Sequence, residues 1–120
     1  MTADEFSQYP NVTYVPRTYD MGSLYATHHL LLAPSLVEDA FPRVITEAGL
    51  HGLATLGSDR GGIPEAVDGG GLVLPHDDAD AWAKAIETCD WAALGGRARE
   101  RALPMVRPCL PEPAATGLLL

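Results

Sequence analysis

The feature that most constrains this chain is a continuous apolar run, His29 to Ala33, which breaks at Pro34-Ser35. A strand with one face in water alternates apolar and polar residues, whereas a strand buried on both faces reads as an unbroken apolar segment. Strands of the second kind belong to parallel sheets that helices cover on both sides. The run therefore predicts a buried strand of an α/β sheet.

The rest of the chain alternates predicted strands with predicted helices. Asp20 and Pro42 stand where helices are expected to begin, and Gly49 and Gly52 stand where one should end. Strands alternating with helices indicate βαβ units, so the expected fold is α/β, a partial doubly wound (Rossmann-like) parallel sheet of about four strands with flanking helices. The expected strands are 11–16, 29–33, 53–56 and 71–74, and the expected helices are 21–27, 64–67 and 91–103, with two more beginning near residue 42 and after residue 78 or 80.

The length of 120 residues suits one domain. Helical periodicity stops after Leu103, and the remaining segment, PMVRPCLPEPAATGLLL, is rich in proline and has no period. We therefore expect a folded domain over residues 1–103 and a disordered or loosely packed tail over residues 104–120.

Composition argues against several functional classes. The formal net charge of -8 is unlike that of proteins that bind nucleic acid or anionic membranes. No apolar run approaches the ~20 residues of a membrane span, and the first ten residues lack the basic start and apolar core of a secretion signal. Cys89 and Cys109 form no disulfide framework and no zinc pattern. We expect a cytoplasmic protein with no nucleic-acid partner and no transmembrane segment.

Two loops are predicted to meet at one edge of the sheet. In open α/β sheets, ligands bind beyond the carboxyl ends of the strands, where residues 34–39 and 58–65 follow two of the expected strands. The glycines at 61 and 62 let backbone N–H groups approach a ligand, and the next helix directs its positive end to the same edge. Glu47 lies about five residues into that helix, roughly 8 Å from its start, and its carboxylate can accept hydrogen bonds from two adjacent hydroxyls. A sugar nucleotide needs both properties.

Several motifs occur together between Asn11 and Glu87. No single motif among them is specific, but their order and spacing together are. They are a strand ending in Pro-Ser, an acid followed eight residues later by Glu-Ala, then Gly-Gly-Ile-Pro-Glu and Gly-Leu-Val-Leu-Pro. In this order and spacing the segment resembles the carboxyl-terminal, donor-binding domain of retaining glycosyltransferases of the GT-B fold, the group 1 glycosyltransferase domain. The resemblance implies metal-independent transfer of a sugar from a nucleotide-sugar donor to a hydroxyl acceptor, without any further cofactor.

The resemblance also assigns roles to particular residues. The family has two glutamates at a fixed spacing, and here Asp39 and Glu47 have that spacing, with aspartate in place of the first glutamate. By resemblance, Asp39 contacts the transferred sugar and Glu47 the nucleotide ribose, which makes them the candidate catalytic pair. The candidate donor-binding residues are Ser35, Arg60, Gly61, Gly62 and Ile63.

Each of these assignments competes with a plainer interpretation. Asp39 and Glu47 could be charges at a helix N-terminus and on a solvated helix face. Gly61-Gly62 could be an ordinary turn, and Arg60 could belong to a surface salt bridge. The segment Asp78-Ala79-Asp80 resembles a metal motif of the other glycosyltransferase fold, but its place before an amphipathic helix favours capping. We expect no metal.

The resemblance further implies parts that these residues do not supply. The family has an amino-terminal acceptor domain, and two earlier strands whose loops carry the Arg and Lys that clamp the diphosphate. A leaving diphosphate is stabilised mainly by such charges. Without those strands the chain should leave a sheet edge open, repack, or fold poorly. We therefore expect a truncated unit that a missing amino-terminal half or partner chain would complete, and little activity from this chain alone. The alternatives are a non-catalytic fragment or binding/scaffold module that keeps the fold, and a flavodoxin-like or Rossmann ligand-binding domain, although no Gly-x-Gly-x-x-Gly is present.

Overall fold

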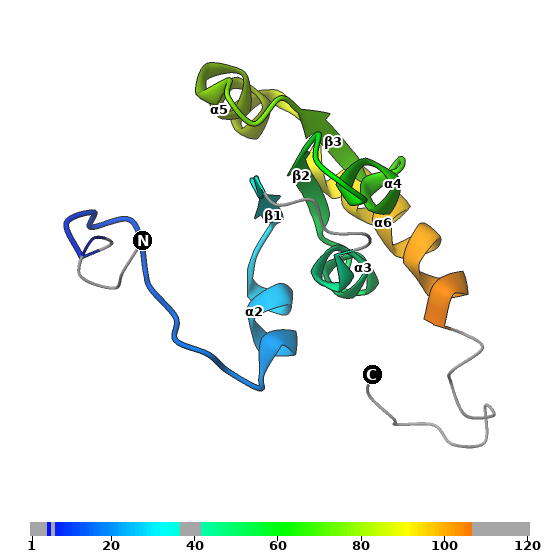
Figure 1. The fold of residues 1–120 in the computed structure, drawn as a ribbon. Helices are drawn as coiled ribbons and strands as arrows, with labels where there is room; N and C mark the ends of the chain where they lie inside the picture. The colour runs from blue at the N-terminus through cyan, green and yellow to red at the C-terminus, as the bar shows by residue number, and fades with distance from the viewer. Residues whose placement is uncertain (1–4, 6, 37–41, 107–120) are drawn as a thin grey trace.

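A computed structural model describes residues 5, 7–36 and 42–106 (Figure 1). Strands and helices alternate along these residues, which confirms the expected α/β class. The elements are α2 (Met21–Thr27), β1 (Leu30–Ala33), α3 (Arg43–Leu50), β2 (Ala54–Ser58), α4 (Ile63–Val67), β3 (Gly71–Leu74), α5 (Ala79–Thr88) and α6 (Trp91–Val106).

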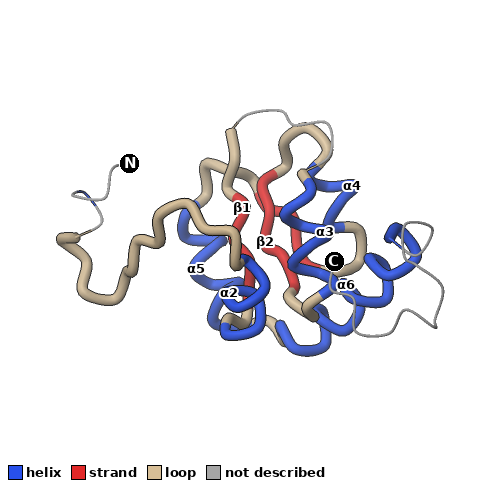
Figure 2. The backbone as a smooth tube through the Cα atoms, turned by 90° about the horizontal axis from the view of Figure 1, so that it is seen from below, coloured by secondary structure: helices blue, strands red, loops and turns tan. Residues whose placement is uncertain are grey.

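Within the described residues the sheet has three parallel strands in the order β1-β2-β3. Leu30 is paired with Ala54 in the first ladder, and Thr55 is paired with Gly71 in the second. Helices α3, α4 and α6 lie on one side of the sheet and α5 lies on the other (Figure 2). The parallel order places the carboxyl ends of all three strands at one edge, where the loops after them lie together.

The core lies between the sheet and the side that carries α3, α4 and α6. All five residues of the central strand β2 are buried, as expected for a parallel strand covered on both faces. Ile45, Ile63 and Val67 form one buried cluster against β1 and β3. Tyr25 joins Ala48 and Leu53 in a second cluster that connects α2 to α3.

Helix α6 packs closely because small residues stand at its contacts. A Cβ atom added to Gly95 would collide with the carbonyl oxygen of Gly52, and one added to Gly70 would lie 2.7 Å from the Cβ of Ala98. Ala102 is 3% exposed and lies near Gly49 of α3. These residues bring the α6 backbone against α3 and the start of β3.

The expected strand at residues 11–16 does not form, so three of the four expected strands are present in the described part. Val12, Tyr14 and Val15 are 41%, 51% and 47% exposed, and the segment extends away from the sheet in Figure 1. Among the residues that the structure describes, no strand pairs with this segment, and strand propensity without a partner does not make a strand. The expectation that β1 is buried on both faces is also wrong, because Leu32 is 47% exposed at the edge of the described sheet.

The predicted helix boundaries are mostly confirmed. Asp20 caps α2 by accepting a hydrogen bond from the Ser23 N–H, and Asp78 caps α5 by accepting one from the Ala81 N–H. Pro42 is the N-cap of α3. Helix α6 does not end at Leu103 as expected but continues to Val106 with Pro104 inside it. The last turn brings the Met105 sulfur within 4.0 Å of the Thr46 hydroxyl, and this contact favours the longer helix. The rest of the expected tail lies outside the described residues.

A membrane span would need a helix both longer and more apolar than any that the described residues form.

Candidate functional site

Glu47 lies on α3 with its side chain towards α2, where the Tyr25 hydroxyl donates a hydrogen bond of 3.2 Å to Glu47 Oε2. Tyr25 is 4% exposed, whereas the Glu47 side chain is exposed. Burial, the negative charge of Glu47 and this hydrogen bond together raise the pKa of Tyr25 to about 12. The tyrosine is therefore a hydrogen-bond donor at neutral pH, and it fixes one oxygen of an otherwise solvated carboxylate.

His51 completes this group at the carboxyl end of α3. Its Nδ1 lies 3.0 Å from the Glu47 carbonyl oxygen, and because a carbonyl can only accept, Nδ1 carries the proton. The His51 ring also contacts the Tyr25 ring, with 5.2 Å between the centroids. Tyr25 thus contacts both the Glu47 carboxylate and the His51 ring, and His51 is bonded to the backbone of α3.

These residues line an open cavity of about 640 Å³, which we call the α2–α3 cavity. Its walls mix one carboxylate, one guanidinium and several aromatic and apolar side chains. Such a lining suits a small polar ligand with an aromatic part. The lining residues are Thr18, Tyr19, Met21, Gly22, Tyr25, Arg43, Thr46, Glu47, Leu50, His51 and Met105.

Ser35 lies beyond the end of β1, and its backbone rather than its side chain makes the described contact. The Ser58 hydroxyl donates a hydrogen bond of 2.6 Å to the Ser35 carbonyl oxygen. Ser58 is fully buried at the end of β2, whereas Ser35 is exposed. The bond ties together the two loops that were predicted to meet at this edge of the sheet.

Arg60 lies in the loop after β2 and reaches the loop after β3. Its Nη2 is 3.4 Å from His76 Nε2. A guanidinium can only donate, so this His76 nitrogen accepts and the proton is on Nδ1, which lies 3.7 Å from Asp59 Oδ1. Arg60 thus connects the loop after β2 to the loop after β3 through His76.

The glycines beside Arg60 form a tight turn into α4. Gly61 has a φ of 50°, which glycine adopts without strain, and Gly62 is the N-cap of α4. Ile63 is 1% exposed and belongs to the core. Its backbone N–H donates to the Arg60 carbonyl oxygen at 3.1 Å. Gly61 is thus exposed whereas Gly62 and Ile63 are buried, and the Ile63 side chain has a packing role.

The predicted site residues do not all come together in the described structure. Glu47 lines the α2–α3 cavity, whereas Ser35, Arg60 and Gly61 lie in the loops beyond the strands and are not among the cavity's described lining residues. Asp39 lies outside the described residues. Sequence reasoning missed Tyr25 as a partner of Glu47. Its position 22 residues before Glu47 gives no local signal, because the two meet only through the packing of α2 on α3.

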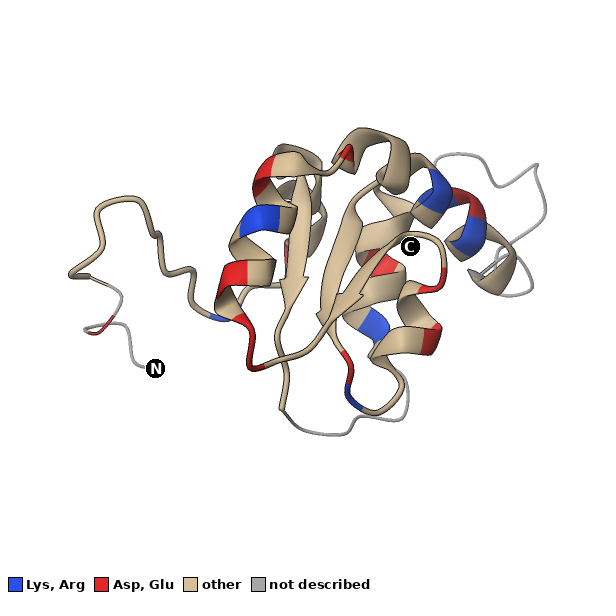
Figure 3. Ribbon diagram, turned by 90° about the horizontal axis from the view of Figure 1, so that it is seen from above, with Lys and Arg blue, Asp and Glu red and all other residues tan. Residues whose placement is uncertain are grey.

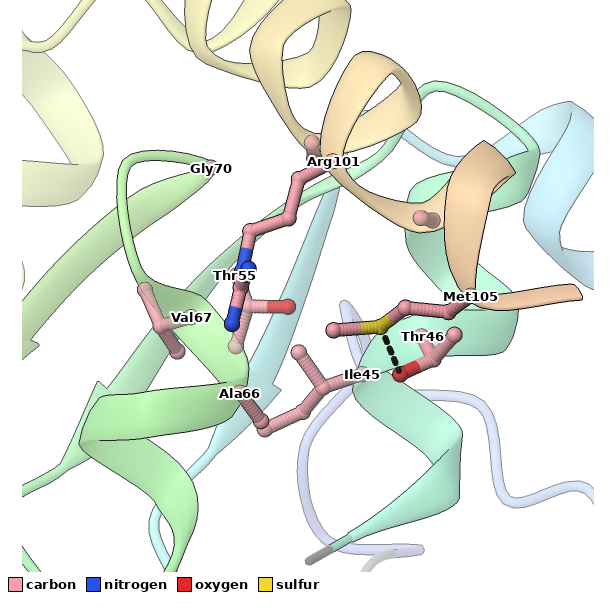
Figure 4. A pocket seen from close by; sticks show the side chains of 10 residues that line it. Ile45, Thr46, Thr55, Ala66, Val67, Gly70, Arg101 and Met105 are labelled. Atoms are coloured by element: carbon pink, nitrogen blue, oxygen red, sulfur yellow. Dashed lines mark hydrogen bonds between the residues drawn. The ribbon is translucent and has the colours of Figure 1, made fainter.

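A second cavity between α3, α4 and α6 is too small for a ligand. It has a volume of about 10 Å³, which is roughly the space of one water molecule. Figure 4 shows the Arg101 side chain extending into it beside Thr55 and Val67. Arg101 Nη2 donates to the Glu65 carbonyl oxygen at 2.7 Å, so this region is a packing contact of α6 on α4.

Charged residues are distributed over several elements. Figure 3 shows Lys and Arg interspersed with Asp and Glu along α5 and α6. Among the described residues, no group of three or more His, Cys, Asp or Glu side chains is placed to hold a metal ion. Metal independence stays a prediction.

Comparison with known proteins extends the sequence interpretation. A family model described as "Glycosyl transferases group 1" matches residues 2–89. No curated protein matches by sequence. The solved structure of sucrose-phosphate synthase from Thermosynechococcus elongatus is similar, with a TM-score of 0.70 and 29% sequence identity. That match covers 85% of this chain and 28% of the synthase chain, so the residues here span well under half of that protein.

Proposed function

Because the chain belongs to the Glycosyl transferases group 1 family, we propose that it forms the donor-binding part of a glycosyltransferase. The reaction moves a sugar from a nucleotide-sugar donor to a hydroxyl acceptor and retains the anomeric configuration. The parallel sheet and its helices are the Rossmann-like part of a GT-B domain. The observation that carries the proposal is the Glu47 carboxylate, held by Tyr25 at the wall of the α2–α3 cavity.

Glu47 is the proposed ribose contact. Its Oε2 accepts the hydrogen bond from Tyr25, and this bond does not involve Oε1. A carboxylate has about four acceptor positions on its two oxygens, so it can take two further hydrogen bonds from adjacent ribose hydroxyls. The cavity volume of about 640 Å³ falls within the ~300–1,000 Å³ range of small-molecule sites.

Two arginines are the proposed phosphate contacts. Arg43 begins α3 and lines the same cavity as Glu47. The two residues are four positions apart and therefore neighbours on one helix face, about 6 Å apart along the axis. Arg60 is at the loop edge beyond β2. Guanidinium groups bind phosphate oxygens through two parallel hydrogen bonds, and the N-terminus of α3 adds a favourable dipole.

The proposed chemistry is a metal-independent displacement on one face of the sugar. The bond between the anomeric carbon and the diphosphate oxygen breaks, and the acceptor oxygen bonds to that carbon on the same face. The acceptor proton passes to the leaving diphosphate. Asp39, assigned to the transferred sugar by resemblance, would contact the donor in this step.

The test is calorimetric titration of the chain with UDP, GDP and ADP. We expect one diphosphate to bind, and Glu47→Ala to weaken it at least tenfold, because hydrogen bonds to a charged group are worth ~1.5–3 kcal/mol. Glu87→Ala is the matched control, since Glu87 is an exposed acid on α5 outside the cavity. A folded chain that binds none of the three, or an equal loss in both variants, would contradict the proposal.

A second measurement separates an enzyme from a binding module. Nucleotide-sugar corresponding to the preferred diphosphate is incubated with the chain, and free sugar is measured. Hydrolysis that Glu47→Ala abolishes supports a catalytic unit. Binding without hydrolysis, even when an amino-terminal half from a family member is supplied, supports the scaffold alternative.

A further inference from the structure

We propose that Tyr25 is a positioning residue, which holds the Glu47 carboxylate in the orientation that receives the ribose hydroxyls. The inference rests on the proposed function and adds a residue to which the sequence motifs gave no role in binding. Tyr25 would not touch the ligand through this hydroxyl. It would act through the oxygen of Glu47 to which the hydroxyl is bonded.

The geometry supports this role because the two side chains come from different helices. Tyr25 is in α2, and Glu47 is in the middle of α3. Their hydrogen bond of 3.2 Å crosses the junction between these helices at the wall of the cavity. An exposed glutamate on a helix face otherwise samples several rotamers, and a ligand would have to select one of them. The hydroxyl of Tyr25 selects a rotamer before the ligand arrives.

The tyrosine is itself firmly placed. It is 4% exposed and packs with Ala48 and Leu53. Its ring contacts the ring of His51, and His51 donates to the Glu47 carbonyl oxygen. The backbone and the side chain of Glu47 are therefore both tied to one aromatic pair. The raised pKa of Tyr25 keeps its hydroxyl protonated at neutral pH, so the donor is present there.

A purely structural role for Tyr25 makes a different prediction. If the hydroxyl only stabilises the packing of α2 on α3, its removal would weaken every ligand of the cavity to the same extent. If it orients Glu47 for ribose, its removal would weaken only ligands that carry the ribose hydroxyls. The contrast between a nucleotide and its dideoxy counterpart separates the two roles.

The experiment measures the affinity of the full chain and of Tyr25→Phe for UDP, GDP and ADP and for their 2′,3′-dideoxy counterparts. The substitution keeps the ring and its packing and removes only the donor. We expect the preferred diphosphate to bind three- to tenfold more weakly, the range that one net hydrogen bond supplies. The dideoxy counterpart should change less than twofold. Tyr9→Phe is the control, because Tyr9 is 47% exposed and is not among the described residues that line the cavity.

A cycle with Glu47→Ala completes the design. Once Glu47 is absent, Tyr25→Phe should cause no further loss of ribonucleotide affinity if the hydroxyl acts through that carboxylate. Equal losses for the ribonucleotide and dideoxynucleotide, an additive cycle, or unchanged affinity in Tyr25→Phe would each overturn the inference while leaving the proposed function intact. A wild-type chain that binds none of the three diphosphates would overturn both.

Discussion

The hydrogen bond from the Tyr25 hydroxyl to Glu47 Oε2, 3.2 Å long, joins a buried ring on α2 to an exposed carboxylate on α3. Burial of Tyr25 disfavours the tyrosinate, and so does the adjacent negative charge. The hydrogen bond itself favours the protonated hydroxyl, which is its donor. Because two of these three influences come from Glu47, the ionisation of Tyr25 reports directly on the position of that carboxylate.

Replacing Glu47 with glutamine should therefore lower the pKa of Tyr25 below its value of about 12, and burial, the largest cause of the shift, should still hold it above 10. Glutamine keeps the size and an acceptor oxygen but removes the charge. The measurement is a spectrophotometric titration of tyrosinate, with the Tyr25→Phe curve subtracted so that only Tyr25 contributes. Glu87→Gln provides the control for loss of one negative charge elsewhere. An identical titration of Tyr25 in wild type and Glu47→Gln would show that the two side chains do not interact in solution.

The same pKa predicts how stability depends on alkaline pH. The pKa of Tyr25 is raised from 10.0 to about 12 on folding, so below pH 10 both states hold the proton and the full contribution is present. Between pH 10 and 12 the unfolded chain releases its proton first, and the free energy of unfolding falls as pH rises. The fall from this group is on the order of 2 kcal/mol. Urea denaturation across this range should show it in wild type and show less of it in Tyr25→Phe; parallel curves would contradict the prediction.

Gly95→Ala should destabilise the protein, because the added methyl group would collide with the carbonyl oxygen of Gly52. Overpacking of this kind costs about 1–3 kcal/mol, which exceeds the gain in helix propensity from replacing glycine by alanine. The measurement is the free energy of unfolding from urea denaturation followed by circular dichroism.

Gly96→Ala is the matched control for that substitution. Gly96 is the next residue of α6 and is exposed, and a Cβ there meets nothing within 4 Å. Only the helix-propensity term then applies, so Gly96→Ala should stabilise by about 0.5–1 kcal/mol. Two variants with the same sign would mean that α6 does not pack on Gly52 as described.

Ser58→Ala should also lower the free energy of unfolding. The Ser58 hydroxyl is fully buried and donates at 2.6 Å to the Ser35 carbonyl oxygen. Its removal deletes this hydrogen bond, and because Ser35 is exposed, the expected cost is that of one net hydrogen bond, about 0.5–1.5 kcal/mol. The loop after β1 should become easier to cleave, so limited proteolysis near Ser35 is the second measurement.

Ser35→Ala separates the backbone of this contact from the side chain. Alanine keeps the carbonyl oxygen that accepts the bond, and the Ser35 side chain is exposed. We expect its stability to stay within about 0.5 kcal/mol of wild type. If Ser35→Ala and Ser58→Ala are equally destabilised, the hydrogen bond between the two loops is not the source of the effect.

Much of the fold could be predicted because its signals are local. The caps at Asp20 and Asp78 and the short apolar strands each follow from a few neighbouring residues. The predictions that failed depend on contacts between residues that are far apart in the sequence. Val12, Tyr14 and Val15 have strand-forming side chains, yet whether a strand forms depends on a neighbour that their sequence does not encode. The end of helix α6 also depends on a distant partner. The helix continues beyond Pro104, and its last turn contacts Thr46 on another helix.

The same distinction between local signals and distant contacts applies to the residues of the candidate site. The candidate acid Glu47 and the loop residue Arg60 were found from motif spacing, which records chemistry that a family reuses. Tyr25 and His76, which hold these two side chains, come from other elements. Nothing in the spacing of Tyr25 or His76 relative to its partner marks the contact. Sequence motifs therefore identify residues that could contact a ligand, but they do not identify the residues that position those side chains.

The proposed phosphate role of Arg60 gives the last prediction. Arg60→Gln should weaken the preferred nucleoside diphosphate about tenfold, because a guanidinium–phosphate contact is a charge-assisted hydrogen bond. The corresponding nucleoside, which has no phosphate, should bind equally well to both proteins, and the dependence of diphosphate affinity on salt should become shallower. Arg97→Gln, an exposed substitution on α6, controls for the loss of one positive charge. Equal losses for nucleoside and diphosphate would show instead that Arg60 acts by holding the loop through His76.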